Sequence, residues 1–179
     1  MNNELSQFVE EFRSAIDKAK EHSEFANDIS FYDFPRGCCG DTSELLACHL
    51  QRRGYETIYV CGLRGDQSHA WLVLIDNNVS KPEQKFLEVT DDIRDVLNLY
   101  SGNKYNEPVD ITRYEAENVE NGLIIDITAD QFSEMKNFPV YIGYMDNFHR
   151  DFEFDFAHEY NGLGNDRLEM LYRIICNYL

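Results

Sequence analysis

The sequence has few basic residues. Lysine and arginine together number 16, against 33 aspartate and glutamate residues, so the formal net charge of the 179-residue chain is −17. Proteins that bind the phosphate backbone of nucleic acids need clustered Lys and Arg side chains that displace counterions. We therefore expect no nucleic-acid partner. The negative charge either keeps the protein soluble or, through long-range attraction, favours a partner or substrate that is basic or carries an amine.

Long apolar runs are also missing. No segment approaches the roughly 18 apolar residues that a membrane-spanning helix needs. The start of the chain, MNNELSQFVEEFRSAIDKAKEH, is too highly charged to be a secretory signal. The five cysteines are an odd number without the spacing of a disulfide framework. These absences predict a cytoplasmic protein with reduced thiols and no membrane partner.

The motifs of common metal and phosphate sites are absent as well. The sequence holds no C-x-x-C pair, no H-E-x-x-H and no G-x-x-x-x-G-K-[ST]. Adjacent cysteines such as Cys38 and Cys39 are poorly placed to share one metal ion. His149 and His158 lie among acidic and aromatic residues, a context that favours ion pairs at the surface. We expect no metal and no cofactor.

Hydrophobic periodicity predicts helices at both ends of the chain. Residues 3–21 and 165–179 each place apolar side chains at three- and four-residue steps along one stripe. A further helix begins near Cys39 and ends before Gly54, a residue suited to the position after a helix.

The segments between these helices are typical of strands. Residues 56–63 and 69–75 are β-branched and apolar and are separated by a loop short enough for a hairpin. Strands are also expected at 139–145, at the start of 122–132, and at 152–156, where aromatic and acidic residues alternate as on an edge strand.

Residues 76–121 differ from the rest because they are polar and carry only a weak helical pattern around Ile93. We interpret this segment as an insertion in a single domain that spans residues 1–179. Helices at both ends of a largely antiparallel sheet make the fold class α+β.

The pair Cys38–Cys39 lies where the second helix begins. A helix N-terminus lowers the pKa of a thiol through its partial positive charge and its unpaired N–H groups, which can also stabilise an oxyanion. Helical geometry alone does not choose between the two thiols, and a buried structural role remains open for either of them.

His69 and Asp126 are the candidate partners of this thiol. His69 opens an apolar strand, and Asp126 lies inside an apolar run where a carboxylate is costly to bury unless it is paired. Antiparallel pairing of 122–127 with 69–75 would place Asp126 directly opposite His69. The carboxylate would then hold the imidazole in the tautomer that accepts a proton from a thiol, which makes a Cys-His-Asp triad.

Three stretches of the sequence resemble the signature blocks of the transglutaminase-like cysteine enzymes, within the papain-like fold: GCCGDTSELLACHLQRRGYETIYVCG, SHAWLVL and IIDITADQF. The resemblance covers about residues 34–75 and 122–132 and is to small bacterial members of the group. In that superfamily the nucleophilic cysteine follows a glycine by two positions, a His-Ala-Trp segment opens a core strand, and an Asp followed two residues later by Thr is the third member.

This resemblance implies the roles of individual residues. Gly37 precedes Cys39 by two positions, so the nucleophile is Cys39, and Cys38 occupies the spacer. His69 and Asp126 complete the catalytic set. The implied fold is a papain-like or transglutaminase-like core, in which the nucleophile helix packs on an antiparallel sheet.

The implied activity is cysteine-dependent acyl transfer through a thioester, on a protein or peptide substrate, as in a protease, a deamidase or a transglutaminase. Two alternatives stay open: an N-acyltransferase with a thioester donor, and a catalytically silent acidic binding module on the same fold. No glutamine is clearly placed to bind an oxyanion, since Gln7 lies in the first helix and Gln131 follows Asp126. We therefore expect an oxyanion site made of backbone N–H groups.

Overall fold

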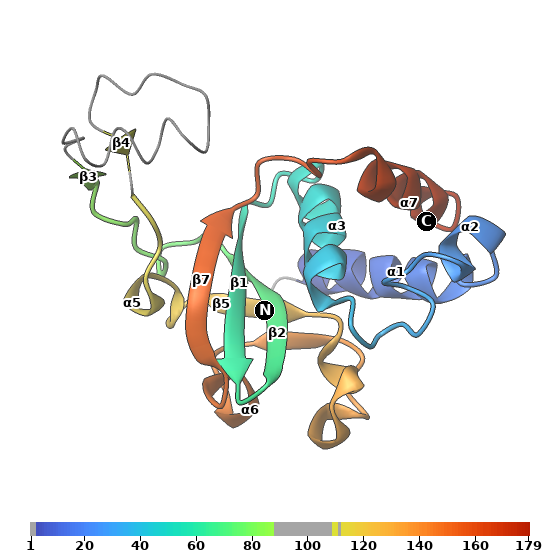
Figure 1. Ribbon diagram of the computed structural model, residues 1–179, viewed down its shortest axis with the longest axis horizontal. Helices are drawn as coiled ribbons and strands as arrows, with labels where there is room; N and C mark the ends of the chain where they lie inside the picture. Colours follow the sequence, from blue (N-terminus) through green and yellow to red (C-terminus); the bar gives the residue numbers. More distant parts are fainter. Residues whose placement is uncertain (1–2, 88–108, 111) are drawn as a thin grey trace.

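A five-stranded antiparallel sheet lies at the centre of the computed structural model, which describes residues 3–87, 109–110 and 112–179. The strands follow the spatial order β6–β5–β2–β1–β7 (Figure 1) and have these bounds: β1 Thr57–Arg64, β2 Gln67–Leu74, β5 Leu123–Asp126, β6 Tyr141–Gly143 and β7 Glu153–Glu159. Strand β2 is therefore the central strand, and β7 is an edge strand.

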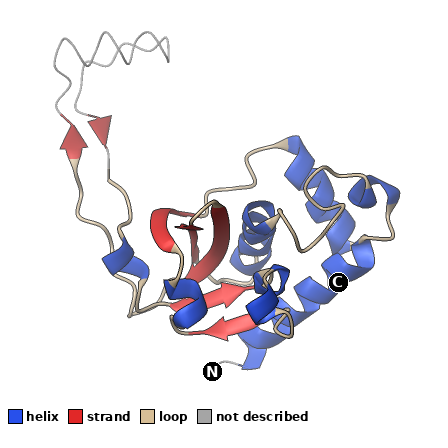
Figure 2. Cartoon of the chain, turned by 60° about the horizontal axis from the view of Figure 1, so that its bottom comes forward, coloured by secondary structure: helices blue, strands red, loops and turns tan. Residues whose placement is uncertain are grey.

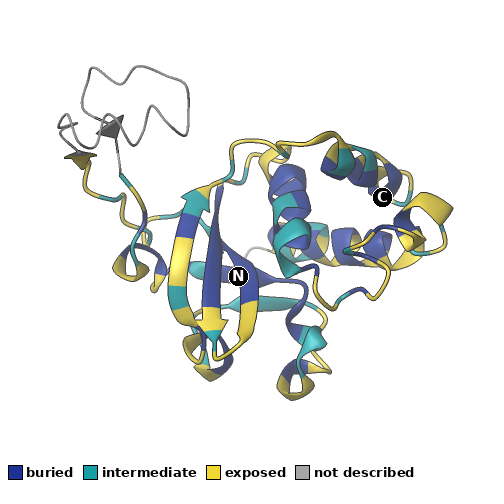
Figure 3. Ribbon diagram, viewed as in Figure 1, coloured by how far each residue is buried: buried dark blue, intermediate teal, exposed yellow. Residues whose placement is uncertain are grey.

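Three helices cover one face of this sheet (Figure 1): α1 Asn3–Ala19, α3 Cys39–Gln51 and α7 Asp166–Cys176. The periodic apolar stripe of α1 forms the helix and buries it, because Val9, Phe12 and Ile16 are fully excluded from solvent. Helix α3 contacts β1 and β2 on one side and α1 and α7 on the other. Figure 3 shows the buried residues concentrated along α3 and the two central strands beside it.

The opposite face of the sheet carries a second apolar core. Trp71 and Val73 of β2 pack there against residues of two short helices, α5 Ala116–Val119 and α6 Asn147–Arg150. The remaining short helical turns are α2 Ser23–Ala26, η1 Ala129–Gln131 and η2 Ser133–Met135. The catalytic candidates lie where these two cores meet at one end of β2.

The structure confirms a mixed α+β architecture with helices flanking an antiparallel sheet. Residues 56–63 and 69–75 form the predicted hairpin, with eight pairs between β1 and β2. The strand expected at 139–145 is shorter, Tyr141–Gly143, and the one expected at 152–156 extends to Glu159. Within the described ranges, no helix is long and apolar enough to cross a membrane.

The segment interpreted as an insertion leaves the sheet as a two-stranded ladder, in which β3 Phe86–Leu87 pairs with β4 Val109–Asp110. Figure 2 shows this ladder extending away from the five-stranded sheet. The helical pattern around Ile93 lies outside the described residues. The segment then returns to the second core, where Tyr114 and Val119 are buried.

Candidate active site

Helix α3 begins at Cys39, so the first candidate residue lies at the helix N-terminus. Gly37 adopts a φ of 70°, a left-handed conformation that favours glycine, and turns the chain into the helix. Cys38 occupies the N-cap position without capping the helix through its side chain. The partial positive charge of the first turn is therefore available to an anion at Cys39.

The two adjacent thiols have opposite environments. The Cys38 thiol is buried and donates a hydrogen bond to the carbonyl oxygen of Pro35 at 3.3 Å. Burial raises the pKa of Cys38 to about 12. Burial also acts to raise the pKa of Cys39, but the hydrogen bond and charge of His69, with the backbone N–H groups of Ala70 and Gly40, lower it below the ordinary value. Cys39 is thus the thiol that forms a thiolate more readily.

His69 and Asp126 are in direct contact. The distance from His69 Nε2 to Asp126 Oδ2 is 2.7 Å, and both side chains are fully buried. Desolvation alone would lower the pKa of His69, but the charge and hydrogen bond of Asp126 raise it to about 9. Burial would likewise raise the pKa of Asp126, and the charge of His69 and the hydrogen bonds of both neighbouring histidines hold it far below its usual range. Each group therefore favours the charged form of the other.

The register that brings His69 and Asp126 together differs from the expected one. Leu72 pairs with Ile125, so the antiparallel ladder places Asp126 opposite Trp71 and not opposite His69. The prediction of direct opposition was wrong by two residues. The contact forms diagonally across the sheet, where side chains two positions apart share one face.

The segment after Asp126 is held to the first helix by Arg13. This buried guanidinium forms two hydrogen bonds with the Asp130 carboxylate at 2.9 Å and also donates to the carbonyl oxygens of Ile127 and Pro139. Thr128 donates both its N–H and its hydroxyl to Asp126 Oδ1, at 2.8 and 3.2 Å. These contacts fix the segment that follows Asp126.

Gln131 borders the site, although its sequence position gave no sign of this. Its side-chain amide nitrogen lies 3.3 Å from His69 Nδ1, and its oxygen accepts a hydrogen bond from the N–H of Gly37 at 3.4 Å. A glutamine amide therefore lies between Gly37, two residues before Cys39, and the imidazole of His69. The turn at η1 brings Gln131 back toward α3, so a side-chain amide lies close to the backbone N–H groups that we expect to form the oxyanion site.

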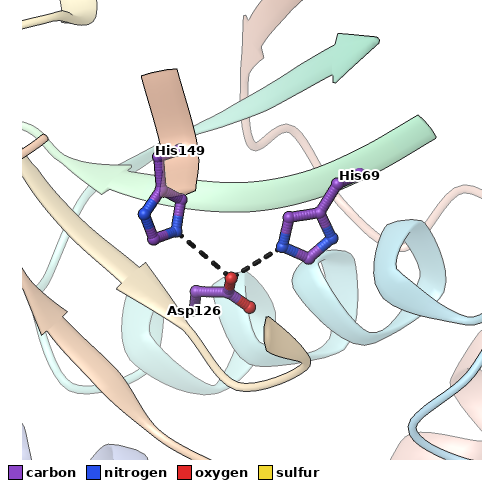
Figure 4. A group of neighbouring side chains, drawn as sticks. All are labelled: His69, Asp126 and His149. Atoms are coloured by element: carbon purple, nitrogen blue, oxygen red, sulfur yellow. Dashed lines mark hydrogen bonds and ion pairs between the residues drawn. The ribbon is translucent and has the colours of Figure 1, made fainter. Parts of the chain in front are cut away.

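His149 is also part of this group of side chains (Figure 4). Its ring is buried, 1% exposed, so the surface role expected for it was wrong. Nε2 lies 3.3 Å from Asp126 Oδ2, and Nδ1 lies 2.7 Å from Asp146 Oδ1. Helix α6 places the ring there. Asp146 lies three residues before His149, and an Asp at this spacing is a typical helix N-cap, which is the feature of the sequence that indicates this short helix. His158, in contrast, is partly exposed and lies 3.5 Å from Glu44.

His69, Asp126 and His149 hold donor atoms that all lie within 4.8 Å of one another. Two ligands about 2.1 Å from a tetrahedral zinc ion would be about 3.4 Å apart. The 2.7 Å between His69 and Asp126 is shorter and is typical of a charge-assisted hydrogen bond. The distances thus fit a proton-carrying network better than a metal centre.

Aromatic rings enclose His69. The rings of Phe132, Phe148, Phe152 and Trp71 lie with their centroids 5.0 to 5.7 Å from the imidazole. This shell keeps water from the His69–Asp126 pair and strengthens the attraction between their charges. The arrangement thus brings together the Cys39 thiol, whose pKa is lowered, the His69 imidazole, whose pKa is raised, and the buried carboxylate of Asp126.

Comparison with family models, with curated proteins and with solved structures finds no match.

Proposed function

We propose that this protein is a cysteine-dependent acyl-transfer enzyme of the transglutaminase-like kind, with a papain-like arrangement of its core. The observation that carries the proposal is the contact of His69 with two groups. One imidazole nitrogen is 2.7 Å from Asp126, and His69 also acts on the Cys39 thiol at the start of a helix and lowers its pKa. A thiol, an oriented imidazole and a carboxylate in this order are the parts that thiol acyl transfer requires.

The reaction begins with a thiolate on Cys39 and an imidazolium on His69. The thiolate sulfur bonds to the carbonyl carbon of an amide or ester, and the carbonyl oxygen becomes an oxyanion near the N-terminus of α3. When this intermediate collapses, the bond to the leaving group breaks, and the leaving group takes the proton of His69. The product is a thioester on Cys39.

Water or an amine then resolves the thioester. Neutral His69 accepts a proton from this second nucleophile, which bonds to the acyl carbon and releases the Cys39 sulfur as a thiolate. Throughout both steps, Asp126 holds the His69 tautomer and stabilises its positive charge. With water the reaction is hydrolysis or deamidation, and with an amine it is cross-linking.

The proposal is tested by the pH dependence of Cys39 alkylation. Iodoacetamide labelling, followed by peptide mass mapping, should show a midpoint well below the free-thiol value of about 8.5 for Cys39. Cys38 should label only in strongly alkaline solution, since its thiol is buried. If Cys39 also labels only at alkaline pH, the protein is instead a binding module on the same fold.

Variants of the two cysteines test the assignment in turnover. Hydrolysis of p-nitrophenyl acetate, a general acyl donor, should be lost in Cys39→Ala and largely kept in Cys38→Ala. The reverse pattern would transfer the nucleophile role to Cys38.

We further propose that the substrate carries positive charge close to the reacting carbonyl. The edge strand β7 has a bulge at Asp155, because Cys61 pairs with Phe156 and Gly62 pairs with Phe154. Bulges beside a site often re-aim a side chain. The charges of Asp155 and Cys39 both act on the Cys61 thiol, whose pKa is raised by burial first and then by these two groups. Asp155 is exposed and makes no ion pair with any residue that the structure describes.

An aromatic surface accompanies this carboxylate. The rings of Tyr59 and Phe156 stack at 5.8 Å, and those of Tyr59 and His158 at 4.8 Å. Phe156 is 46% exposed, and the Tyr59 hydroxyl lies beside Gly40, next to the nucleophile. A Lys or Arg side chain satisfies both features, because it stacks on an aromatic face and pairs with a carboxylate.

Charged thiol reagents test this substrate charge in a Cys176→Ser background, which removes an exposed thiol. Cationic aminoethyl methanethiosulfonate should modify Cys39 about tenfold faster than its anionic sulfonatoethyl analogue. Asp155→Asn should reduce this ratio, whereas Glu24→Gln, which removes one exposed charge from α2, should not. Equal effects of the two variants would mean that only the net charge matters.

A further inference from the structure

His149 is fully buried beside the triad, yet the reaction proposed above does not use it. Its ring packs between Trp71 and Tyr141, with centroid distances of 5.2 and 4.9 Å. Its two nitrogens contact Asp126 on one side and Asp146 on the other. A buried imidazole between two carboxylates needs a physical explanation, because its protonation state follows from its partners.

Each of these contacts requires a proton on the ring. A carboxylate oxygen only accepts hydrogen bonds, and a neutral imidazole carries a single N–H. A neutral His149 would therefore direct a lone pair toward Asp126 or Asp146, at 3.3 or 2.7 Å. Both contacts become hydrogen bonds only when both nitrogens are protonated, which makes the ring an imidazolium.

The acceptor count of Asp126 leads to the same conclusion. Its Oδ1 accepts two hydrogen bonds from Thr128, and its Oδ2 accepts from His69 at 2.7 Å and contacts His149 at 3.3 Å. A carboxylate offers about four lone-pair sites. All four are used when His149 donates, so the carboxylate of Asp126 has no freedom to rotate away from His69.

We propose that His149 is a positioning residue, an imidazolium held between Asp146 and Asp126 that fixes the Asp126 carboxylate for His69. The charges then alternate along the network, from a thiolate through an imidazolium, a carboxylate and a second imidazolium to the outer carboxylate. Among the described residues, the titratable or charged groups around the ring are these: Asp126 on β5, Asp146 before α6, His69 on β2, Tyr141 on β6 and the neighbouring Arg150 on α6, with Glu120 and Glu153 lining the same cavity. Only the catalytic consequence rests on the proposed function.

Ring protonation is measured directly by NMR. In ¹⁵N-labelled protein, long-range ¹H–¹⁵N spectra distinguish a protonated ring nitrogen from an unprotonated one. We expect both nitrogens of His149 to be protonated at pH 7, and His149→Gln assigns the signals by their disappearance. An unprotonated nitrogen on His149 at pH 7 overturns the proposal. This result does not depend on any enzyme activity.

Asp146→Asn isolates the charge of the outer carboxylate. Asparagine is as good an N-cap as aspartate, so its side-chain oxygen can still accept from the His149 backbone N–H and from Nδ1. The ring loses only the charge of its outer partner, and we expect the long-range ¹H–¹⁵N spectrum at pH 7 to show weaker protonated-nitrogen signals for His149 than in the wild-type protein. An unchanged His149 spectrum would contradict the role of Asp146.

Turnover tests the positioning role. His149→Phe keeps the ring volume but removes the donor to Asp126, and we expect the kcat of p-nitrophenyl acetate hydrolysis to fall about 10- to 100-fold, as after loss of other supporting hydrogen bonds. His149→Gln retains one N–H donor and should recover part of the rate, with KM little changed in both. His22→Gln, at the partly exposed position before α2, is the matched control and should behave as wild type.

A folded His149→Phe protein with wild-type kcat would remove His149 from the site. If that variant does not fold, the NMR and Asp146→Asn results decide the proposal. If wild-type Cys39 forms no acyl enzyme at all, the proposed function fails while the protonation of His149 remains established by NMR.

Discussion

At the scale of residues, neighbours in the sequence behave differently because of what they meet in space. Cys38 and Cys39 are adjacent, yet one thiol is buried against a carbonyl and the other meets an imidazole and backbone N–H groups. The pKa of Cys38 is raised and that of Cys39 is lowered because their surroundings differ. Residue type alone therefore did not choose between them, and the Gly-x-Cys resemblance pointed to the one with the activating contacts.

Two residues of the site, His149 and Gln131, are not indicated by the sequence. The sequence indicates Asp126, because a carboxylate in an apolar run is costly to bury unless it is paired. His149 and Gln131 lie in short turns, α6 and η1, and nothing in the local pattern says that these turns fold back onto β5 and α3. Their roles depend on tertiary contacts between distant segments, and such contacts leave no periodic signal.

Asp126→Asn tests the contact of Asp126 with His69 at this scale. The amide keeps the shape of the side chain but can favour the wrong imidazole tautomer and no longer stabilises the imidazolium. We expect kcat for p-nitrophenyl acetate to fall by on the order of 10²–10⁴ and the midpoint pH of Cys39 alkylation to rise. A well-folded variant with near-normal turnover would exclude Asp126 from catalysis.

The same pair should make stability depend on pH. Because the pKa of His69 is raised to about 9 in the folded protein, its stabilisation is fully present below the unfolded value of about 6.5 and is lost as the pH rises through 9. Urea denaturation at several pH values should show the free energy of unfolding falling across this window. In His69→Gln the decline should be smaller, and an identical decline would assign it to other groups.

Gln131→Ala tests the amide that borders the nucleophile loop. If this amide stabilises the oxyanion, its removal should lower kcat for p-nitrophenyl acetate by about 10²–10³. Alkylation of Cys39 by iodoacetamide forms no oxyanion, so its rate should change little. Gln7→Ala on α1 serves as a glutamine control. Parallel losses in both reactions would instead indicate that Gln131 only positions His69.

At the scale of elements, the sequence indicated the long helices and the central hairpin but not the finer geometry. Residues 3–21 and 165–179 were identified because an apolar stripe defines a helix regardless of its partners. The register of β5 against β2 was misjudged by two residues, since several pairings keep the same face buried. A shift of two preserves the side on which Asp126 lies, so Asp126 still contacts His69.

Arg13 links two elements, and its removal should be costly. Arg13→Met keeps much of the side-chain volume but leaves the Asp130 carboxylate and two carbonyl oxygens without their buried donor. We expect a loss of about 3 kcal/mol in the free energy of unfolding, measured by urea denaturation.

The matched control for Arg13 is Arg173→Met. Arg173 forms an exposed i,i+4 pair with Glu169 on α7, at 3.0 Å, and its loss should cost less than about 1 kcal/mol. Similar losses from the two variants would show that the buried network around Arg13 adds nothing beyond an ordinary surface pair.

At the scale of the whole molecule, the insertion between β2 and β5 contains residues that do not pack into either apolar core. Lys81 and Glu83–Phe86 are exposed, whereas Ser80 exchanges hydrogen bonds with Asn118 of α5. We therefore expect that replacing residues 81–108 with a short Gly/Ser linker leaves one cooperative thermal transition and acylation of Cys39 by p-nitrophenyl acetate. Extending the replacement to residue 119 should destabilise the protein, because Tyr114 and Val119 are buried. Global unfolding of the first variant would show that the replaced part of the insertion belongs to the core.

The contacts that build the site join residues far apart in the sequence, so they also determine when Cys39 of a newly synthesised chain acquires its environment. Arg13 meets Asp130 across 117 positions, His69 meets Asp126 across 57, and Asp126 meets His149 across another 23. Contacts of such high sequence separation form late in folding. A ribosome-bound chain of fewer than 126 residues lacks Asp126, so His69 has no carboxylate partner and the environment that lowers the pKa of Cys39 is incomplete. We therefore expect rapid alkylation of Cys39 at neutral pH only after the segment that carries Asp126 has been synthesised and packed against β2.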